Sequence, residues 1–235
     1  KGKNTLLKQF YNLDDYKKTH WSGTFQDYVD IIGETPEVAR NAYQRLYDMI
    51  ISYGTEETVD FKKKIMRYNF FDDPIDNGQD AVYGIDVSLM KLVNVLKSAA
   101  KGYGAQNRVI LLHGPVGSAK STIARLLKKG LEKYSRQDAG RLYTFSWVNP
   151  NNIEIPVFRQ LKDLGVDELV DPMNEEPLKL IPEDIRPKFF EEMFRGKKIE
   201  NKLKIMGDLN PASRYMFTEL MKYYGGEYGP FDGKI

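Results

Sequence analysis

The residues with the clearest chemical potential are a short group of glycines followed by a lysine and two hydroxyl side chains. Gly114 and Gly117 precede Lys120, and Ser121 and Thr122 follow it, in the stretch HGPVGSAKST. Glycines let the backbone come close to a bound group, while the lysine supplies a cation and the next hydroxyl a metal ligand. This spacing is typical of a Walker A loop, which binds the phosphates of a nucleotide.

The elements expected on either side of this loop are those that a phosphate site needs. Residues 109–112, Val-Ile-Leu-Leu, form an uninterrupted apolar run, which predicts a strand buried on both faces of a parallel sheet. After Ser121, apolar residues recur at helical spacing. They are Ile123, Leu126, Leu127 and Leu131. Because a helix N-terminus presents unpaired amides and a partial positive charge, this order predicts a nucleotide site.

Two side chains of the loop have separate expected roles. We expect Lys120 to reach the β and γ phosphates as the catalytic residue, and the Ser121 hydroxyl to help hold Mg²⁺. The other loop residues expected to line the phosphates are Gly114, Pro115, Val116, Gly117, Ser118, Ala119 and Thr122.

One position departs from the common pattern G-x-x-x-x-G-K-[ST], because Ala119 stands where glycine is usual. If φ is negative there, the methyl group costs little; if φ is positive, the loop is strained by about 1 kcal/mol or more. The alternative interpretation of the stretch is an ordinary strand-to-helix turn that happens to be rich in small residues. The flanking strand and helix patterns favour the nucleotide site.

Composition narrows the class of protein. The 235 residues suit one large domain or two small ones, and a formal net charge of +2 without a basic stripe argues against nucleic-acid binding. The absence of cysteine excludes thiolate metal sites, and two histidines make a histidine-rich one unexpected. The apolar runs are too short to cross a bilayer and no secretory signal opens the chain, so we expect a cytoplasmic protein without membrane contact.

Helical periodicity dominates the first part of the chain. The pattern predicts helices over 25–33 and 36–54, the second with Thr35 as its N-cap. Residues 55–79 contain strong breakers and are predicted to be a connection. Its Asp72-Asp73 pair could be proposed as a metal site, but adjacent carboxylates before a proline more often form a solvated turn.

A further helix is expected to begin at Asp86, as its N-cap, and to end near Lys101. Tyr83, Gly84 and Ile85 stand immediately before it. A glycine-containing turn there could let an adenine ring lie against backbone, with Tyr83 and Ile85 as apolar walls. The alternative is a plain helix start.

The chain after the loop helix alternates in a way typical of a strand over 142–149, LYTFSWVN. With the strand at 109–112 and the helix between them, it predicts a βαβ unit. Residues 149–185 are rich in proline and predicted to be irregular. Further helices are expected at 157–164, at 186–195 and from Pro211, with Asn210 as N-cap.

The chain resembles the N-terminal half of the PrkA family, bacterial proteins called serine protein kinases and built on an AAA+ nucleotide-binding domain. The resemblance covers residues 20–225. It is carried by WSGTFQDYV, RLYDMI, YNFFDD, YGID, LLHGPVGSAKST, GLEKYSR, DPMNEEPLKLIP and GDLNPASRYMF. In the form of this family that we know best, the DPMNEEPL stretch starts with Cys and has His in place of Asn174.

The resemblance implies an α/β fold of P-loop NTPase (AAA+) type, with a parallel sheet flanked by helices. It divides the chain into an N-terminal helical segment with its connection, 1–80, and an AAA+ nucleotide-binding domain, 81–235, incomplete at its C-terminal side. It makes Ala119 a family trait, places Tyr83–Ile85 at the adenine and implies ATP and Mg²⁺ as cofactors. The partners expected are a protein substrate or client and, through AAA+ contacts, a homo-oligomer.

Hydrolysis at such a site needs more than the loop. It requires an acidic pair on a second strand, a polar sensor and an arginine from a neighbouring subunit. The nearest sequence candidate, 204–208, has a charge and a glycine where apolar residues belong. The resemblance places these parts beyond Ile235.

Three functions are compatible with these patterns. The first is a serine protein kinase that transfers phosphate from ATP to protein Ser or Thr, although the sequence lacks the usual protein-kinase motifs. The second is an AAA+ ATPase that remodels or unfolds a protein partner, either alone or linked to a protease. The third is a nucleotide-sensing module that binds ATP without turnover.

Overall fold

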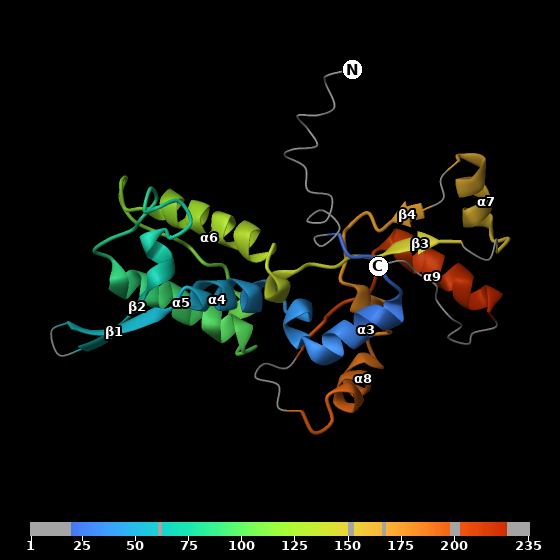
Figure 1. Cartoon of the computed structure of the whole chain (residues 1–235), viewed down its shortest axis with the longest axis horizontal. Helices are drawn as coiled ribbons and strands as arrows, with labels where there is room; N and C mark the ends of the chain where they lie inside the picture. Colours follow the sequence, from blue (N-terminus) through green and yellow to red (C-terminus); the bar gives the residue numbers. More distant parts are fainter. Residues whose placement is uncertain (1–19, 61–62, 150–152, 166–167, 198–202, 225–235) are drawn as a thin grey trace, which may run out of the picture. The chain divides into compact units, whose positions relative to one another are not determined.

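The computed structural model describes residues 20–60, 63–149, 153–165, 168–197 and 203–224 (Figure 1). The chain divides into two compact units. The loop unit consists of Glu37–Arg141 with Lys198–Lys204, and the flanking unit consists of Lys1–Pro36, Leu142–Lys197 and Ile205–Ile235. The residues before His20 lie outside the described part of the chain.

The first α-helix of the loop unit begins later in the sequence than predicted. Pro36–Ala39 forms a short 3₁₀ turn, and α4 spans Ala42–Ser52. Asn41 is the N-cap: its side chain accepts a hydrogen bond from the Gln44 amide, and the Gln44 side chain accepts one from the Asn41 amide. This reciprocal capping satisfies two amides that would otherwise lack partners, so the helix starts there.

A β-hairpin replaces part of the connection predicted at 55–79. β1 (Thr55–Asp60) pairs antiparallel with β2 (Lys63–Tyr68), with Thr55 opposite Tyr68. β2 contacts α5 (Asp86–Ala100), and Ile65 and Tyr68 are buried. The prediction was wrong here because half of the strand residues are charged, so local propensity is weak, and contact with α5 stabilises the hairpin.

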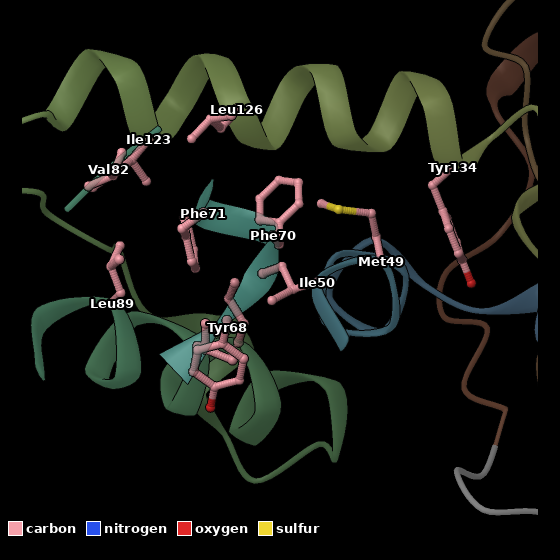
Figure 2. Packing of buried hydrophobic residues seen from close by; sticks show 12 residues of the cluster. Met49, Ile50, Tyr68, Phe70, Phe71, Val82, Leu89, Ile123, Leu126 and Tyr134 are labelled. Atoms are coloured by element: carbon pink, nitrogen blue, oxygen red, sulfur yellow. The ribbon is translucent and has the colours of Figure 1, made fainter. Parts of the chain in front are cut away.

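One apolar core holds the loop unit together (Figure 2). α4 contacts both α5 and α6 (Lys120–Tyr134), and the 3₁₀ turn Asn69–Asp72 lies in the same core. Its members include Met49, Ile50, Phe70, Phe71, Val93, Leu96, Ile123 and Leu126. Residues before and after position 80 share this core. The two units are defined by contacts and do not test the predicted domain assignment, which stays a prediction.

Close approach beneath α6 depends on a glycine within the helix. A Cβ atom built on Gly130 would lie 2.6 Å from the Met49 sulfur and 2.7 Å from a ring carbon of Phe70. Both distances are shorter than van der Waals contact, and Figure 2 shows Met49 and Phe70 beneath α6. Gly130 therefore sets how near α6 comes to α4 and the 3₁₀ turn.

The strand predicted at 109–112 does not form within the described residues. Val109 and Leu111 are 95% and 80% exposed, and no described strand pairs with the segment. Both sheets are antiparallel pairs, so neither the expected parallel sheet nor the βαβ unit is seen in this part of the chain. A strand buried on both faces needs neighbouring strands, and no described strand pairs with this segment.

The flanking unit has a second apolar core. β3 (Ser146–Val148) pairs antiparallel with β4 (Glu168–Val170), and does not form the predicted βαβ unit with 109–112. The helices are α3 (Phe25–Glu34), α7 (Pro156–Asp163), α8 (Arg186–Met193) and α9 (Pro211–Tyr223). Asn210 caps α9 as predicted. The core is formed by Phe145, Trp147, Ile153, Ile155, Phe158, Leu209, Met216 and Leu220.

Gly130→Ala tests the packing beneath α6. We expect it to lower the free energy of unfolding by about 1–3 kcal/mol because the added methyl group overpacks the core, although alanine by itself favours a helix by about 1 kcal/mol. Urea unfolding followed by circular dichroism measures the change. Gly33→Ala in α3 is the matched control, because nothing lies within 4 Å of a Cβ atom there. Equal stabilisation by both substitutions would contradict the close packing.

Candidate functional site

The backbone of the glycine-containing loop is strained, a question that the sequence alone did not decide. Gly117 has φ +84°, and Ala119 has φ +58° as the N-cap residue of α6. Alanine in this left-handed conformation costs about 1–2 kcal/mol. Its methyl group packs against the apolar core of the loop unit, which offsets part of that cost. The condition for strain at Ala119 is therefore met.

Lys120 is folded back over the loop that precedes it. Its ammonium donates hydrogen bonds to the carbonyl oxygens of Gly114 at 2.8 Å and Pro115 at 2.5 Å. It also donates to the Ser118 hydroxyl at 2.8 Å, and that hydroxyl donates to the Pro115 carbonyl. The loop thus holds a cation against its own backbone, at the start of α6.

Gly114 leaves room for the Ser118 hydroxyl in this arrangement. A Cβ atom at position 114 would lie 2.7 Å from the Ser118 hydroxyl oxygen and 4.0 Å from the Lys120 nitrogen. A side chain at position 114 would therefore displace the Ser118 hydroxyl, whereas the Lys120 nitrogen lies at an ordinary contact distance.

The N-terminus of α6 has no side-chain cap. Lys120, Ser121 and Thr122 form its first turn, and Ser121 is exposed. Uncapped amides, the helix dipole and an ammonium group form the donor set that phosphates bind. Pro115 and Val116 are exposed on the loop that leads to this turn.

The Ser121 hydroxyl beside this donor set suits magnesium bound together with a nucleotide. Within the part of the chain that the structure describes, no group of three or more His, Asp or Glu side chains is placed to hold a metal ion. Mg²⁺ usually takes few protein ligands and completes its octahedron with phosphates and water, so a single hydroxyl such as that of Ser121 suits it.

The segment proposed for adenine lies next to α6. Val82 is buried in the same core as Ile123 of the first turns of α6, and Figure 2 shows the two side chains together. Tyr83 is 70% exposed, and Gly84 has φ +77°. Ile85, half-buried against the core, is the N-cap residue of α5.

The predicted cap of α5 needs a correction. Asp86 is the first residue of the helix rather than its N-cap, and no side chain caps the helix at Ile85. The carboxylate still lies in the first turn, where its negative charge interacts favourably with the positive end of the helix dipole. The sequence pattern placed the boundary one residue late because a capping aspartate and a first-turn aspartate look alike.

Sequence reasoning missed an ionic network between the Asp72–Asp80 segment and α6. The Asp73 carboxylate, 0% exposed, accepts hydrogen bonds from the amides of Asp76 and Asp80, at 3.3 and 2.8 Å, and an ion pair from Lys129 at 3.3 Å. The interpretation of Asp72-Asp73 as a solvated turn was therefore wrong for Asp73. The sequence signal that could have revealed the network is the pair Arg125 and Lys129, which are spaced i,i+4 on a predicted helix. An acidic run precedes them in the sequence.

The remainder of the network surrounds Asp80. Lys129 donates to Asp80 at 3.1 Å and to Asp76 at 2.5 Å. Arg125 donates to both carboxylate oxygens of Asp80, at 2.9 and 2.5 Å. Two cations from one helix therefore bind carboxylates from one loop.

This network shifts the pKa values of its members. Hydrogen bonds from Arg125 and then from Lys129 lower the pKa of Asp80 to about 2. Burial by itself would raise the pKa of Asp73, but the amides of Asp80 and Asp76, together with Lys129, outweigh it and hold the pKa below its ordinary value. The hydrogen bond to Asp76 is the main cause that raises the pKa of Lys129.

The weak acidic candidate at 204–208 does not gain support. Its described residues form no strand, Met206 is exposed, and Asp208 belongs to the flanking unit, whereas the glycine-containing loop belongs to the loop unit. Nearby, the buried guanidinium of Arg186 donates to the carbonyl oxygens of Ile205 and Gly207. These contacts fix a backbone turn and hold no acidic pair.

Residues 23–234 match the family described as the PrkA AAA domain. The chain belongs to this family. Membership of this family implies the P-loop NTPase class of α/β fold and nucleotide binding. None of the described helices is long and apolar enough to cross a membrane.

Two relatives of this PrkA AAA domain extend the comparison. It is 35% identical over 214 residues to the ATP-dependent protease PrkA of Bacillus subtilis (strain 168), which covers 91% of the chain and 27% of that protein. It is 34% identical over 94 residues to an uncharacterized protein in the gldA 5' region of Geobacillus stearothermophilus, covering 40% of the chain and 86% of that protein. No solved structure matches the chain. The chain thus spans about a quarter of the length of the Bacillus relative.

The ionic network predicts a loss of stability in acid. Asp80 ionises more readily in the folded chain, with a pKa of about 2, than in an unfolded one, where aspartate has a pKa of about 3.9. Its contribution is therefore complete above about pH 4 and is lost as the pH falls toward 2. Urea unfolding between these pH values should give a shallower pH dependence for Asp80→Asn than for wild type. Asp163→Asn, at an exposed position on α7, should leave the slope unchanged.

Proposed function

We propose that residues 114–122 bind the triphosphate of Mg-ATP. The observation that carries this proposal is the Lys120 ammonium, held by neutral loop oxygens at the uncapped start of α6. Phosphate oxygens are charged acceptors and form stronger hydrogen bonds than carbonyls and hydroxyls do. A triphosphate can therefore draw Lys120 from Gly114, Pro115 and Ser118 while the helix amides bind the same phosphates.

Magnesium and adenine complete the proposed site. The exposed Ser121 hydroxyl supplies one Mg²⁺ ligand, and the bound ion neutralises charge on the phosphates. Tyr83, Gly84 and Ile85 border the adenine ring, because the backbone that carries them adjoins the first turns of α6 through Val82. Because Gly84 has no side chain, the backbone there is left uncovered, and its positive φ suits glycine.

We further infer that residues 109–112 are the central strand of the parallel sheet of an AAA+ fold. Their four apolar side chains suit a strand covered on both faces, yet Val109 and Leu111 are almost fully exposed. Leaving such surface in water costs about 25 cal/mol for each Å². Additional strands that pair with this segment would remove that cost and complete the sheet.

For the use of ATP, we propose ATP-dependent handling of a protein client that is coupled to proteolysis. The Bacillus relative is named an ATP-dependent protease, and this name favours the second of the three functions over the first. The domain would then act as a homo-oligomer in which a neighbouring subunit supplies the arginine that hydrolysis requires.

Phosphotransfer to protein Ser or Thr is the second candidate. A lysine and helix amides stabilise a transferring phosphoryl group whether water or a hydroxyl attacks it, so the geometry of Lys120 supports both reactions. Binding of ATP without turnover is the third outcome that an experiment can distinguish.

The substitution Lys120→Ala tests the phosphate site. We expect ATP affinity to fall on the order of 10- to 150-fold, because a charge-assisted hydrogen bond contributes about 1.5–3 kcal/mol. Isothermal titration with Mg-ATP measures it. Lys133→Ala, at an exposed position near the end of the same helix, serves as the control and should bind ATP as wild type does. Equal affinities for wild type and Lys120→Ala would exclude the assignment.

The fate of γ-labelled phosphate separates the three uses of ATP. Wild type and Lys120→Ala are incubated with labelled Mg-ATP, both as this chain and as the longer protein, with a protein client present. Free phosphate that is absent with Lys120→Ala supports the ATPase function, and degradation of the client in the longer protein supports its link to proteolysis. Label on protein Ser or Thr would favour the kinase instead, and binding without turnover in the longer protein would leave the sensor.

A further inference from the structure

The Asp73–Asp80 segment is fastened to α6 by charged contacts that we name the latch, formed by Asp73, Asp76 and Asp80 with Arg125 and Lys129. Lys129 forms ion pairs with all three carboxylates, and Arg125 binds Asp80 through two nitrogens. Because Asp73 is fully buried, the free energy of its charge depends on these partners and on the amides that face it. The latch therefore has a specific geometry and is not a set of solvated surface pairs.

The backbone of the segment is shaped for this contact and ends beside the proposed adenine residues. Asp73 has φ +54°, in the left-handed region, which aspartate tolerates better than most residues. The Gly78 amide donates to the Asp73 carbonyl at 2.9 Å, and the Val82 amide donates to the Phe71 carbonyl at 2.9 Å. The segment is thus closed at its base, and the next residue is Tyr83.

Both the latch and the phosphate loop are attached to the same helix. Lys120 is the first residue of α6, and Arg125 and Lys129 follow on the same continuous helix. A helix rises about 1.5 Å for each residue, so the latch lies about 7–14 Å along the axis from Lys120. A rigid helix thereby connects the end that would bind phosphates to the side chains that hold the Asp73–Asp80 segment.

We propose that the latch positions Tyr83–Ile85 against the base of a nucleotide whose phosphates occupy the loop. This inference rests on the proposed function. Arg125 and Lys129 are positioning residues, since they act through the segment and do not touch the nucleotide. They determine how much the base adds to the affinity that the phosphates provide.

The size of the effect follows from the population of the correctly placed segment. If the segment occupied its position in only one molecule in ten without the latch, the affinity for ATP would fall about tenfold. A ligand without a base gains nothing from Tyr83–Ile85, so its affinity would not change. The ratio of the two affinities therefore reports on the latch.

The experiment compares Mg-ATP with Mg-tripolyphosphate, which carries the phosphates alone, by titration calorimetry on the purified chain. Lys129→Met keeps the length and helix propensity of the side chain but removes the cation. We expect it to weaken ATP binding by about tenfold and to change tripolyphosphate binding by less than about twofold. Lys128→Met, an exposed neighbour on α6, is the matched control and should change neither affinity. Lys129→Arg should restore most of the affinity for ATP.

A second variant distinguishes a specific loss of ATP affinity from misfolding of Lys129→Met. Arg125→Met removes only the contact with Asp80 and leaves Lys129 beside the buried Asp73, and the same selective loss of ATP affinity is expected, to a smaller extent. Equal losses of affinity for ATP and tripolyphosphate, or no loss of affinity in either variant, would overturn the proposed role of the latch. If wild type bound neither ligand, the phosphate site itself would be refuted and this inference with it, which distinguishes the two failures.

Discussion

The packing of α6 over Met49 and Phe70 is the contact on which the loop unit depends. It requires Gly130, because a methyl group at that position would lie within 3 Å of both neighbours. The same helix carries Lys120 at its first residue and Arg125 and Lys129 further on. Its position therefore fixes the glycine-containing loop and the Asp73–Asp80 segment together. A change in how α6 sits on the core would move both, because close-packed interiors transmit displacement rather than absorb it.

The strain at Ala119 and the charges of the latch share one physical basis. In each case an unfavourable local state is held by tertiary contacts: a left-handed alanine by packing on the core, and a buried carboxylate by amides and a lysine. Such states persist only where the surroundings over-determine them, and they are found mainly at functional sites. Their occurrence along one helix agrees with the nucleotide site that we propose for its N-terminus.

The prediction from sequence was most accurate where the signal is local. The helix after the loop, the helix that begins near Asp86 and the Asn210 cap all depend on periodicity and on residues only a few positions apart. The hairpin of β1 and β2 was missed because its strands are highly charged and its stability comes from α5. The segment 109–112 has the composition of a buried strand, but pairing requires partners that composition cannot supply.

By itself, the sequence determined the family, the spacing of Gly114, Gly117, Lys120 and Ser121, and the helix that follows them. These features are encoded in contiguous residues. The tertiary structure alone decided that Lys120 folds onto Gly114 and Pro115, that Ala119 takes a positive φ, and that Asp73 is buried beside Lys129. Partners 56 positions apart meet only when the chain has folded, so their burial and charge pairing depend on packing rather than on local propensity.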